Sequence, residues 1–323
     1  MRYQSIHLLL ALGLIANSGG LLGAPPGPSQ PDLVLQAGPE ESVTSLAVSP
    51  DGTLVATSSF DGRVRVHDAR TGALLRAIGS DTERGGRAVV FAPDGRSLTV
   101  AGFHMDKLVG VYDVRTGKRE RTLAGHTEWE AYATAFSSDG KLLASSGVDK
   151  QVLVWDLATG ALRHRLGDQS SPVSTLAFSP DGATLAGGGA DKTIRLWDAT
   201  SGRLIRSLAG HRDWVSTLAF SPDGKTIASA SCDWAYHRGR DPSRFEGRDS
   251  GAESEWKLWD AATGTLKRTV TDAGRLLSLA FAPDGKSLAC GLGNDVRLYD
   301  LQAESPSRLV TSHEGAIMRC LLA

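Results

Sequence analysis

The chain has 323 residues, with 35 basic and 36 acidic side chains and a formal net charge of −1. Because these charges are spread along the sequence, they exclude the basic patch or stripe of a dedicated nucleic-acid-binding protein. Helical spacing of apolar residues is almost absent, and glycine is frequent at 37 residues, as many tight turns require.

Residues 1–24 have the features of a secretory signal peptide. A short basic start precedes an apolar run from Ile6 to Ala16, and small residues follow it. The run is shorter than the roughly twenty apolar residues that cross a bilayer, so we expect no integral membrane span. We therefore predict export from a bacterial-type cell, to the periplasm or the medium. The alternative is a cytoplasmic protein whose N-terminal segment is disordered or buried.

Residues 25–31 are rich in proline and are predicted to form a linker. Residues 32–323 are assigned to one domain, because a single pattern recurs along them. Its first element is an expected strand at residues 32–36.

A four-residue turn element, Ser-Pro-Asp-Gly in its commonest form, occurs six times in this domain. Successive copies start 43, 45, 42, 42 and 61 residues apart. A period in this range marks a stacked or radial repeat architecture. The copies are Ser49–Gly52, Ala92–Gly95, Ser137–Gly140, Ser179–Gly182, Ser221–Gly224 and Ala282–Gly285.

Each copy joins two short runs of apolar and β-compatible residues, as in residues 217–229. Proline presets φ, aspartate bonds back to the backbone and glycine accepts the left-handed conformation, so a hairpin is predicted. A third strand ends in an aromatic-Asp pair, and a fourth alternates apolar and basic residues, as at an outer edge that discourages pairing with other chains. Four antiparallel strands per unit, repeated radially, predict an all-β propeller with six complete blades.

These units resemble WD40 repeats. Gly125-His126 and Gly210-His211 match the pair that opens the family's repeat, and Trp-Asp closes it at 155–156, 197–198 and 259–260. The resemblance covers residues 33–323. It implies a propeller of the WD40 type that acts as a non-catalytic scaffold for an unidentified protein or peptide partner, without a cofactor or a metal.

The resemblance also implies a buried, hydrogen-bonded set of histidine, serine, aspartate and tryptophan within a blade. Such a set looks like a catalytic triad, but its recurrence in separate blades predicts a structural role and no catalytic residues. Two complete sets can be carried over: His126, Ser145, Asp149 and Trp155, and His211, Ser229, Asp233 and Trp259.

The end of the chain resembles the start of one more repeat. Residues 312–323 look like the Gly-His loop and first strand of a seventh blade that lacks its turn. With residues 32–36 as the outer strand, we expect a partial seventh blade in a truncated ring. The alternative is a six-bladed ring with residues 312–323 as a tail.

The interval of 61 residues locates an insertion at about residues 234–252, between the second and third strands of blade five and on the same face as the Gly-His loops. Aromatic residues interleaved with arginines suggest a contact surface, although a long loop can also be merely tolerated. The candidates are Trp234, Tyr236, Arg238, Arg240, Arg244 and Phe245. Trp129 and Trp214 are further candidates, each three residues after a Gly-His histidine, with packing inside the repeat as the alternative.

The cysteines, Cys232, Cys290 and Cys320, follow no metal-ligand spacing and are predicted to be buried free thiols. Two other functions stay open from the sequence. The chain could be an interaction module of a larger, truncated polypeptide, or an enzyme with its site at the mouth of the central channel.

Overall fold

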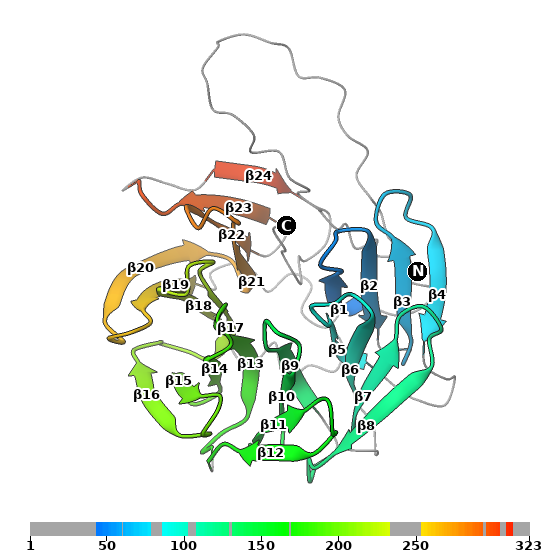
Figure 1. The fold of residues 1–323 in the computed structure, drawn as a ribbon. Helices are drawn as coiled ribbons and strands as arrows, with labels where there is room; N and C mark the ends of the chain where they lie inside the picture. Colours follow the sequence, from blue (N-terminus) through cyan, green and yellow to red (C-terminus); the bar gives the residue numbers. More distant parts are fainter. Residues whose placement is uncertain are drawn as a thin grey trace, which may run out of the picture.

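The computed structural model describes residues 43–59, 61–78, 86–102, 108–128, 131–167, 169–232, 253–292, 295–303 and 308–312. These residues contain 24 strands in six four-stranded antiparallel sheets, and no helix. The sheets are arranged radially as the blades of a propeller (Figure 1). The prediction of an all-β propeller with six complete blades is confirmed. Residues 1–24, 25–31, 32–36 and 313–323, to which the signal peptide, the linker and parts of a seventh blade were assigned, lie outside the described residues.

The blades follow one another along the chain. Blade one comprises β1 (Val43–Val48), β2 (Leu54–Ser59), β3 (Val64–Asp68) and β4 (Leu74–Ile78). Blade two comprises β5 (Gly86–Phe91), β6 (Ser97–Gly102), β7 (Leu108–Asp113) and β8 (Arg119–Ala124). Blade three comprises β9 (Ala131–Phe136), β10 (Leu142–Gly147), β11 (Val152–Asp156) and β12 (Leu162–Arg165).

The second half repeats this plan. Blade four comprises β13 (Val173–Phe178), β14 (Thr184–Gly189), β15 (Thr193–Asp198) and β16 (Leu204–Ala209). Blade five comprises β17 (Val215–Phe220), β18 (Thr226–Ser231), β19 (Glu253–Asp260) and β20 (Leu266–Ala273). Blade six comprises β21 (Leu276–Phe281), β22 (Ser287–Leu292), β23 (Asp295–Asp300) and β24 (Arg308–Ser312). Strands β19 and β20, at eight residues each, are longer than their counterparts.

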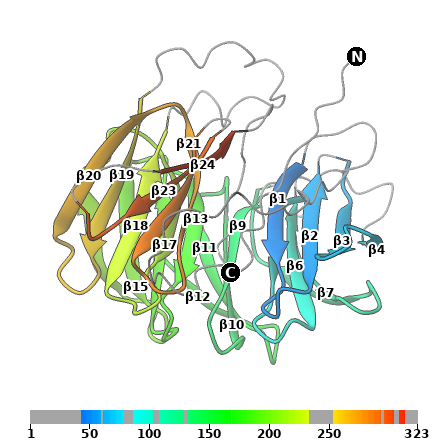
Figure 2. The same cartoon turned by 90° about the horizontal axis from the view of Figure 1, so that it is seen from above.

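The strands of all blades run between the same two faces of the molecule (Figure 2). One face, here the turn face, carries the Pro-Asp-Gly turns and the turns between third and fourth strands. The other, here the loop face, carries the Gly-His loops at 125–126 and 210–211 and the start and end of the insertion. Because connections alternate between the two ends of an antiparallel sheet, this division follows from strand order alone.

The turns are fixed by local hydrogen bonds. In blade five, Asp223 Oδ1 accepts hydrogen bonds from Ser221 Oγ at 2.6 Å and from the Lys225 amide at 3.0 Å. These bonds hold the pKa of Asp223 below its usual value. Gly224 follows with φ of 71°, the left-handed conformation that glycine adopts without strain. The hairpin is therefore encoded by four neighbouring residues, as predicted.

Neighbouring blades are held together by apolar side chains and by their inner strands. Between blades three and four, for example, Val152 and Val154 share a buried cluster with Leu185 and Trp197. A cluster of this kind lies at each junction from blades one and two to blades five and six. On the far side of blade six, Ala289, Val296 and Leu298 form a cluster that includes no described residue of blade one, and the two terminal blades stand apart in Figure 1.

Basic side chains of the fourth strands also join neighbouring blades. Each donates a hydrogen bond to a carbonyl in the turn between the third and fourth strands of the next blade. The pairs are Arg76 with Thr116 at 3.3 Å, Arg121 with Ala158 at 3.3 Å, His164 with Thr200 at 2.8 Å, Arg206 with Ala262 at 2.6 Å and with Thr263, and Arg268 with Ala303 at 3.3 Å. From the sequence, we predicted for these charges only the role of guarding an outer edge. The structure adds a second role, because the same side chains connect consecutive blades.

Candidate functional site

The first predicted histidine set lies in blade three and forms one chain of hydrogen bonds. His126 Nδ1 lies 2.9 Å from Asp149 Oδ2, and His126 Nε2 lies 2.8 Å from Ser145 Oγ. The Trp155 indole donates to the same Ser145 oxygen at 2.9 Å. A single proton arrangement satisfies every group: histidine donates to the carboxylate, serine to the histidine and tryptophan to the serine. This is the geometry that the resemblance implies.

The Asp149 carboxylate also fixes the backbone around it. It accepts hydrogen bonds from the amides of Thr127 at 2.8 Å and Gln151 at 3.1 Å. Although burial favours the neutral acid, the bonds from His126 and from these amides hold the pKa of Asp149 below its usual value. The set thus joins the loop that enters the blade to the turn between β10 and β11.

The glycine before the histidine is required by the same arrangement. A Cβ atom on Gly125 would lie 2.5 Å from Cη2 of the Trp155 ring, closer than real side chains approach. The Trp155 ring therefore packs directly on the glycine backbone in blade three. In blade five, a Cβ on Gly210 would lie 3.5 Å from the Trp259 ring, an ordinary contact.

In blade five the structure places a glutamate beside the histidine of the set. His211 Nε2 lies 2.7 Å from Ser229 Oγ, which also accepts the Trp259 indole at 2.8 Å. The carboxylate 3.1 Å from His211 Nδ1 belongs to Glu255, whereas we predicted Asp233, which lies outside the described residues. Asp233 was chosen because it follows Ser229 by four residues, as Asp149 follows Ser145 in blade three. In blade five, the insertion begins directly after this position. Glu255 re-enters on β19 opposite Ser231.

Glu255 also forms a buried ion pair with Lys257 in the blade interior. Its Oε2 lies 3.0 Å from Lys257 Nζ, and only 4% of the Glu255 side chain and 6% of the Lys257 side chain are exposed. Lys257 donates a further bond to Thr269 Oγ1 at 3.2 Å. Burial lowers the pKa of His211 to about 4, although the neighbouring Glu255 opposes this shift. At neutral pH the cluster is therefore an ionised Glu255–Lys257 pair beside an uncharged His211.

Two of the blades without the full set pair an aspartate with an arginine instead. In blade one, Arg65 Nη2 lies 2.5 Å from Asp61 Oδ2, and in blade four, Arg195 Nη2 lies 2.7 Å from Asp191 Oδ2. In each case the aspartate aligns with Asp149 of blade three, and the arginine follows it by four residues. The guanidinium replaces the imidazole as the partner of the carboxylate.

Blade six uses a carboxylate from its neighbour. Asp272, at the end of the lengthened strand β20, accepts hydrogen bonds from Arg297 Nη1 at 2.8 and 2.9 Å and from the Tyr299 hydroxyl. The basic partners of these carboxylates were not predicted from the sequence. A basic residue stands two positions before the aromatic of the third strand at 65, 195, 257 and 297, and this spacing would have found them.

The structure buries Trp214, contrary to the exposure expected of a partner anchor. Its residue is 3% exposed, and the indole donates to Ser174 Oγ at 2.6 Å. The ring also meets Tyr132 edge to face, with centroids 6.5 Å apart. Trp214 is thus a packing residue, and its partners lie on the inner strands of the two preceding blades, outside its own repeat. Trp129 lies outside the described residues.

The inserted segment itself, with Trp234, Tyr236, Arg238, Arg240, Arg244 and Phe245, also lies outside the described residues. The described residues on either side of it are held by hydrogen bonds. The Cys232 amide donates to the Trp214 carbonyl at 3.2 Å, and Glu255 accepts the Arg212 amide at 2.8 Å. Beside them, 74% of the Arg212 side chain is exposed on the loop face. The insertion thus starts and ends at fixed points next to an exposed arginine.

Other predicted chemistry can be placed only in part. Cys232 and Cys290 are buried, as predicted, and Cys320 lies outside the described residues. Among the residues that the structure describes, no group of three or more His, Cys, Asp or Glu side chains could hold a metal ion. In the same part of the chain, no helix has the length and apolar character needed to cross a membrane.

A family model described as "WD domain, G-beta repeat" matches residues 31–68, 117–156, 160–198, 202–235 and 264–300. These stretches cover more than half of the chain. The chain belongs to the WD40 family. Strands β5 to β7 fall between the first two matched stretches and still form a blade. In that WD40 blade, a Cβ on Gly110 would lie 2.5 Å from the Tyr112 ring, so the tyrosine packs closely on the backbone of its own strand.

Similar stretches occur in much longer proteins. The chain is 46% identical over 68 residues to Coronin-7 of Homo sapiens and, equally, of Pongo abelii. It is 43% identical over 67 residues to Coronin-7 of Rattus norvegicus. Each match covers 20% of this chain, and it spans about 7% of the length of the curated relative.

Proposed function

We propose that this WD40 protein is a non-catalytic scaffold that binds another protein or a peptide on its loop face. The observation that supports this most directly is the enclosure of its only serine–histidine–acid sets among the described residues. Ser145 and Ser229 are fully buried, and each serine oxygen is engaged by a histidine and a tryptophan. A nucleophile needs an exposed oxygen and room for a substrate beside it, and neither serine has them.

A buried ion pair next to the insertion supports the loop face as the binding surface. Burying two charges is costly unless both are paired and hydrogen-bonded. Blade five holds such a pair, Glu255 and Lys257, where the insertion returns to the sheet. A rigid base limits the entropy that the inserted residues lose when they bind a partner. We propose that Trp234, Tyr236, Phe245 and the arginines between them supply the contact, together with Arg212.

Export is part of the same proposal. Residues 1–24 carry the pattern of a signal peptide, and a scaffold of this kind would then act outside the cytoplasm, in the periplasm or after secretion. Fractionation of cells that express the full chain tests this part separately. Recovery of the uncleaved chain in the cytoplasmic fraction would contradict it.

The binding proposal is tested by removing residues 235–252 and comparing captured partners with those of the full chain. Affinity capture from the extracytoplasmic fraction, followed by mass spectrometry, should lose its specific partner in the deletion variant. Lys225→Gln, an exposed change on the turn face, is the matched control and should retain that partner. Identical partners for the deletion variant and the full chain would show that the loop is merely tolerated.

A further inference from the structure

The six repeated turns on the turn face share one backbone geometry and differ in their first residue. In every copy the glycine has φ between 67° and 71°, and its amide donates to the carbonyl of the first residue at 2.8 to 2.9 Å. That first residue is serine in blades one, three, four and five, and alanine in blades two and six. The aspartate before the glycine is exposed in all six turns, as Asp51, Asp94, Asp139, Asp181, Asp223 and Asp284. The chain therefore compares the same turn with and without a hydroxyl group.

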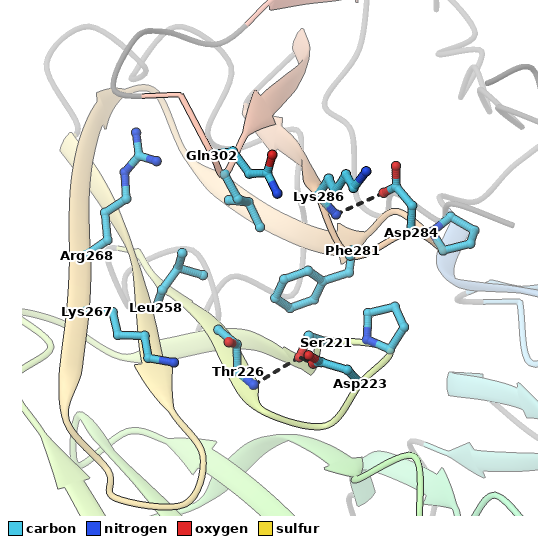
Figure 3. Close-up of a pocket in the computed structure, with 14 residues that line it drawn as sticks. Ser221, Asp223, Thr226, Leu258, Lys267, Arg268, Phe281, Asp284, Lys286 and Gln302 are labelled. Carbon is cyan, nitrogen blue, oxygen red and sulfur yellow. Dashed lines mark hydrogen bonds between the residues drawn. The ribbon is translucent and has the colours of Figure 1, made fainter. Parts of the chain in front are cut away.

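The serine hydroxyl holds the aspartate and the next strand together. In blade five, Ser221 Oγ donates to Asp223 Oδ1 at 2.6 Å and accepts the Thr226 amide at 2.9 Å (Figure 3). The other three serine turns have the same two bonds, with the hydroxyl 2.5 to 2.7 Å from the carboxylate and the amide at 2.9 Å. In all four turns the serine bond is the main cause that holds the pKa of the aspartate below its usual value. Serine thus fixes the carboxylate in place and in its ionised form.

The alanine turns cannot make these two bonds, because alanine has no hydroxyl group. Asp284 Oδ1 accepts the Lys286 amide at 2.9 Å, the second dashed line in Figure 3, and Asp94 Oδ1 accepts the Arg96 amide at 2.8 Å. The serine turns have the equivalent of this amide bond as well, at 3.0 Å. Asp94 and Asp284 are therefore without the bond that fixes the other four aspartates.

An aspartate that precedes glycine can react with its own backbone. The glycine amide nitrogen attacks the carboxyl carbon of the neutral acid, a C–N bond forms, and the hydroxyl group leaves as water with the amide proton. Water then opens the five-membered succinimide, and opening at the backbone carbonyl gives isoaspartate. Glycine favours the attack because no Cβ hinders its nitrogen. The reaction needs the neutral acid and a carboxyl group that can move onto the nitrogen, and the serine bond opposes both.

We propose that Asp94 and Asp284 are the Asp-Gly sites at which this protein forms isoaspartate, and that the four serine turns resist the reaction. Both carboxyl groups are exposed, so water can reach the succinimide. The chain has one further Asp-Gly pair at Asp61, where Ser59 and Arg65 both bind the carboxylate, and this pair should resist as well. The product has an additional methylene group in the main chain. It therefore alters the turn face as the protein ages, independently of partner binding on the loop face.

The test is to keep the folded full chain at neutral pH for several weeks, at a temperature below its melting transition. Digestion with endoproteinase Asp-N, which cuts before aspartate but not before isoaspartate, is followed by mass spectrometry and gives the extent of reaction at each turn. We expect isoaspartate to form at Asp94 and Asp284 roughly threefold to tenfold faster than at the serine turns, the factor by which one net hydrogen bond changes a local equilibrium. Equal rates at all six turns, or faster reaction at the serine turns, would overturn the proposal.

Single substitutions exchange the two kinds of turn. Ser221→Ala should raise the rate at Asp223 to that at Asp284. Ala282→Ser should lower the rate at Asp284 severalfold, and it should fold as the parent chain does, because four turns already have serine at this place. The rate at Asp94 should stay unchanged in both variants and serves as the internal standard. Unchanged rates at the targeted aspartates in these folded variants would refute the role of the hydroxyl group.

The unfolded chain separates the effect of the turn from that of the local sequence. In guanidinium, where the turns are lost, all six aspartates should react at similar rates, since each is followed by glycine. A preference for Asp94 and Asp284 that persists in the unfolded chain would show that the folded turn is not its cause.

Discussion

Replacing Glu255 with glutamine removes one of the two charges buried in blade five. Glutamine retains an oxygen that can accept the Arg212 amide, but it brings an uncharged group to Lys257 Nζ, which now lies 3.0 Å from a carboxylate oxygen. The Lys257 side chain is only 6% exposed, so its ammonium would have little contact with water and no counter-ion. Removing one partner of a buried pair costs about 3–5 kcal/mol.

Blade three supplies the matched comparison. Asp149→Asn removes the corresponding carboxylate, but a buried leucine, Leu153, stands where blade five has its lysine. The loss there is restricted to charge-assisted hydrogen bonds, about 1–3 kcal/mol. We therefore expect Glu255→Gln to lower the free energy of unfolding more than Asp149→Asn does.

The assay is denaturant unfolding followed by the fluorescence of the chain's 7 tryptophans. In the double variant Glu255→Gln with Lys257→Met, both charges are absent, and at least half of the lost stability should return. Asp233→Asn should change stability little, since Glu255 holds the position beside His211. If Glu255→Gln costs no more than Asp149→Asn, or if Lys257→Met gives no rescue, the reasoning about a desolvated pair is wrong.

Three further predictions concern pH and backbone geometry. Between pH 6.5 and about 4, His211 is protonated in the unfolded chain but neutral in the folded blade. The free energy of unfolding should therefore fall as the pH is lowered through this window, by at most about 1.4 kcal/mol per pH unit. His211→Gln should flatten the slope of unfolding free energy against pH. Lys150 has φ of 62° at the position where blade one has Gly62, so Lys150→Gly should raise the melting temperature, by the equivalent of roughly 0.5–1 kcal/mol; a lower melting temperature would contradict this. Gly95→Ala should cost about 1–2 kcal/mol for its left-handed backbone, whereas Gly264→Ala should cost more in the same unfolding assay, because its Cβ would also strike the arginine of the preceding blade; equal losses would disprove that contact.

Much of the fold could be predicted from short segments, because short segments determine it. The Pro-Asp-Gly turns hold themselves together through bonds between residues two to five positions apart, such as those around Ser221 and Asp223. The alternation of the strands then sets which side chains face the next blade. Six copies of such a unit predict six blades.

The site was harder to predict, because its contacts join residues that the repeat pattern does not align. The insertion shifts the acid of blade five from the expected Asp233 to Glu255, and Asp272 crosses from one blade to the next to reach Arg297. The burial of Trp214 depends on Ser174, forty residues earlier in the chain. None of these pairings follows from spacing within a single repeat.

The amino-acid sequence by itself determined the repeat, the four-stranded blade and the histidine set of blade three, since each of these is encoded within one unit of about forty residues. Tertiary structure alone decided which carboxylates serve blades five and six and which tryptophan is enclosed. The physical reason is that these features depend on how neighbouring blades pack. Asp272 reaches Arg297 because blade five packs against blade six, and Trp214 is enclosed because blade four places Ser174 beside its indole.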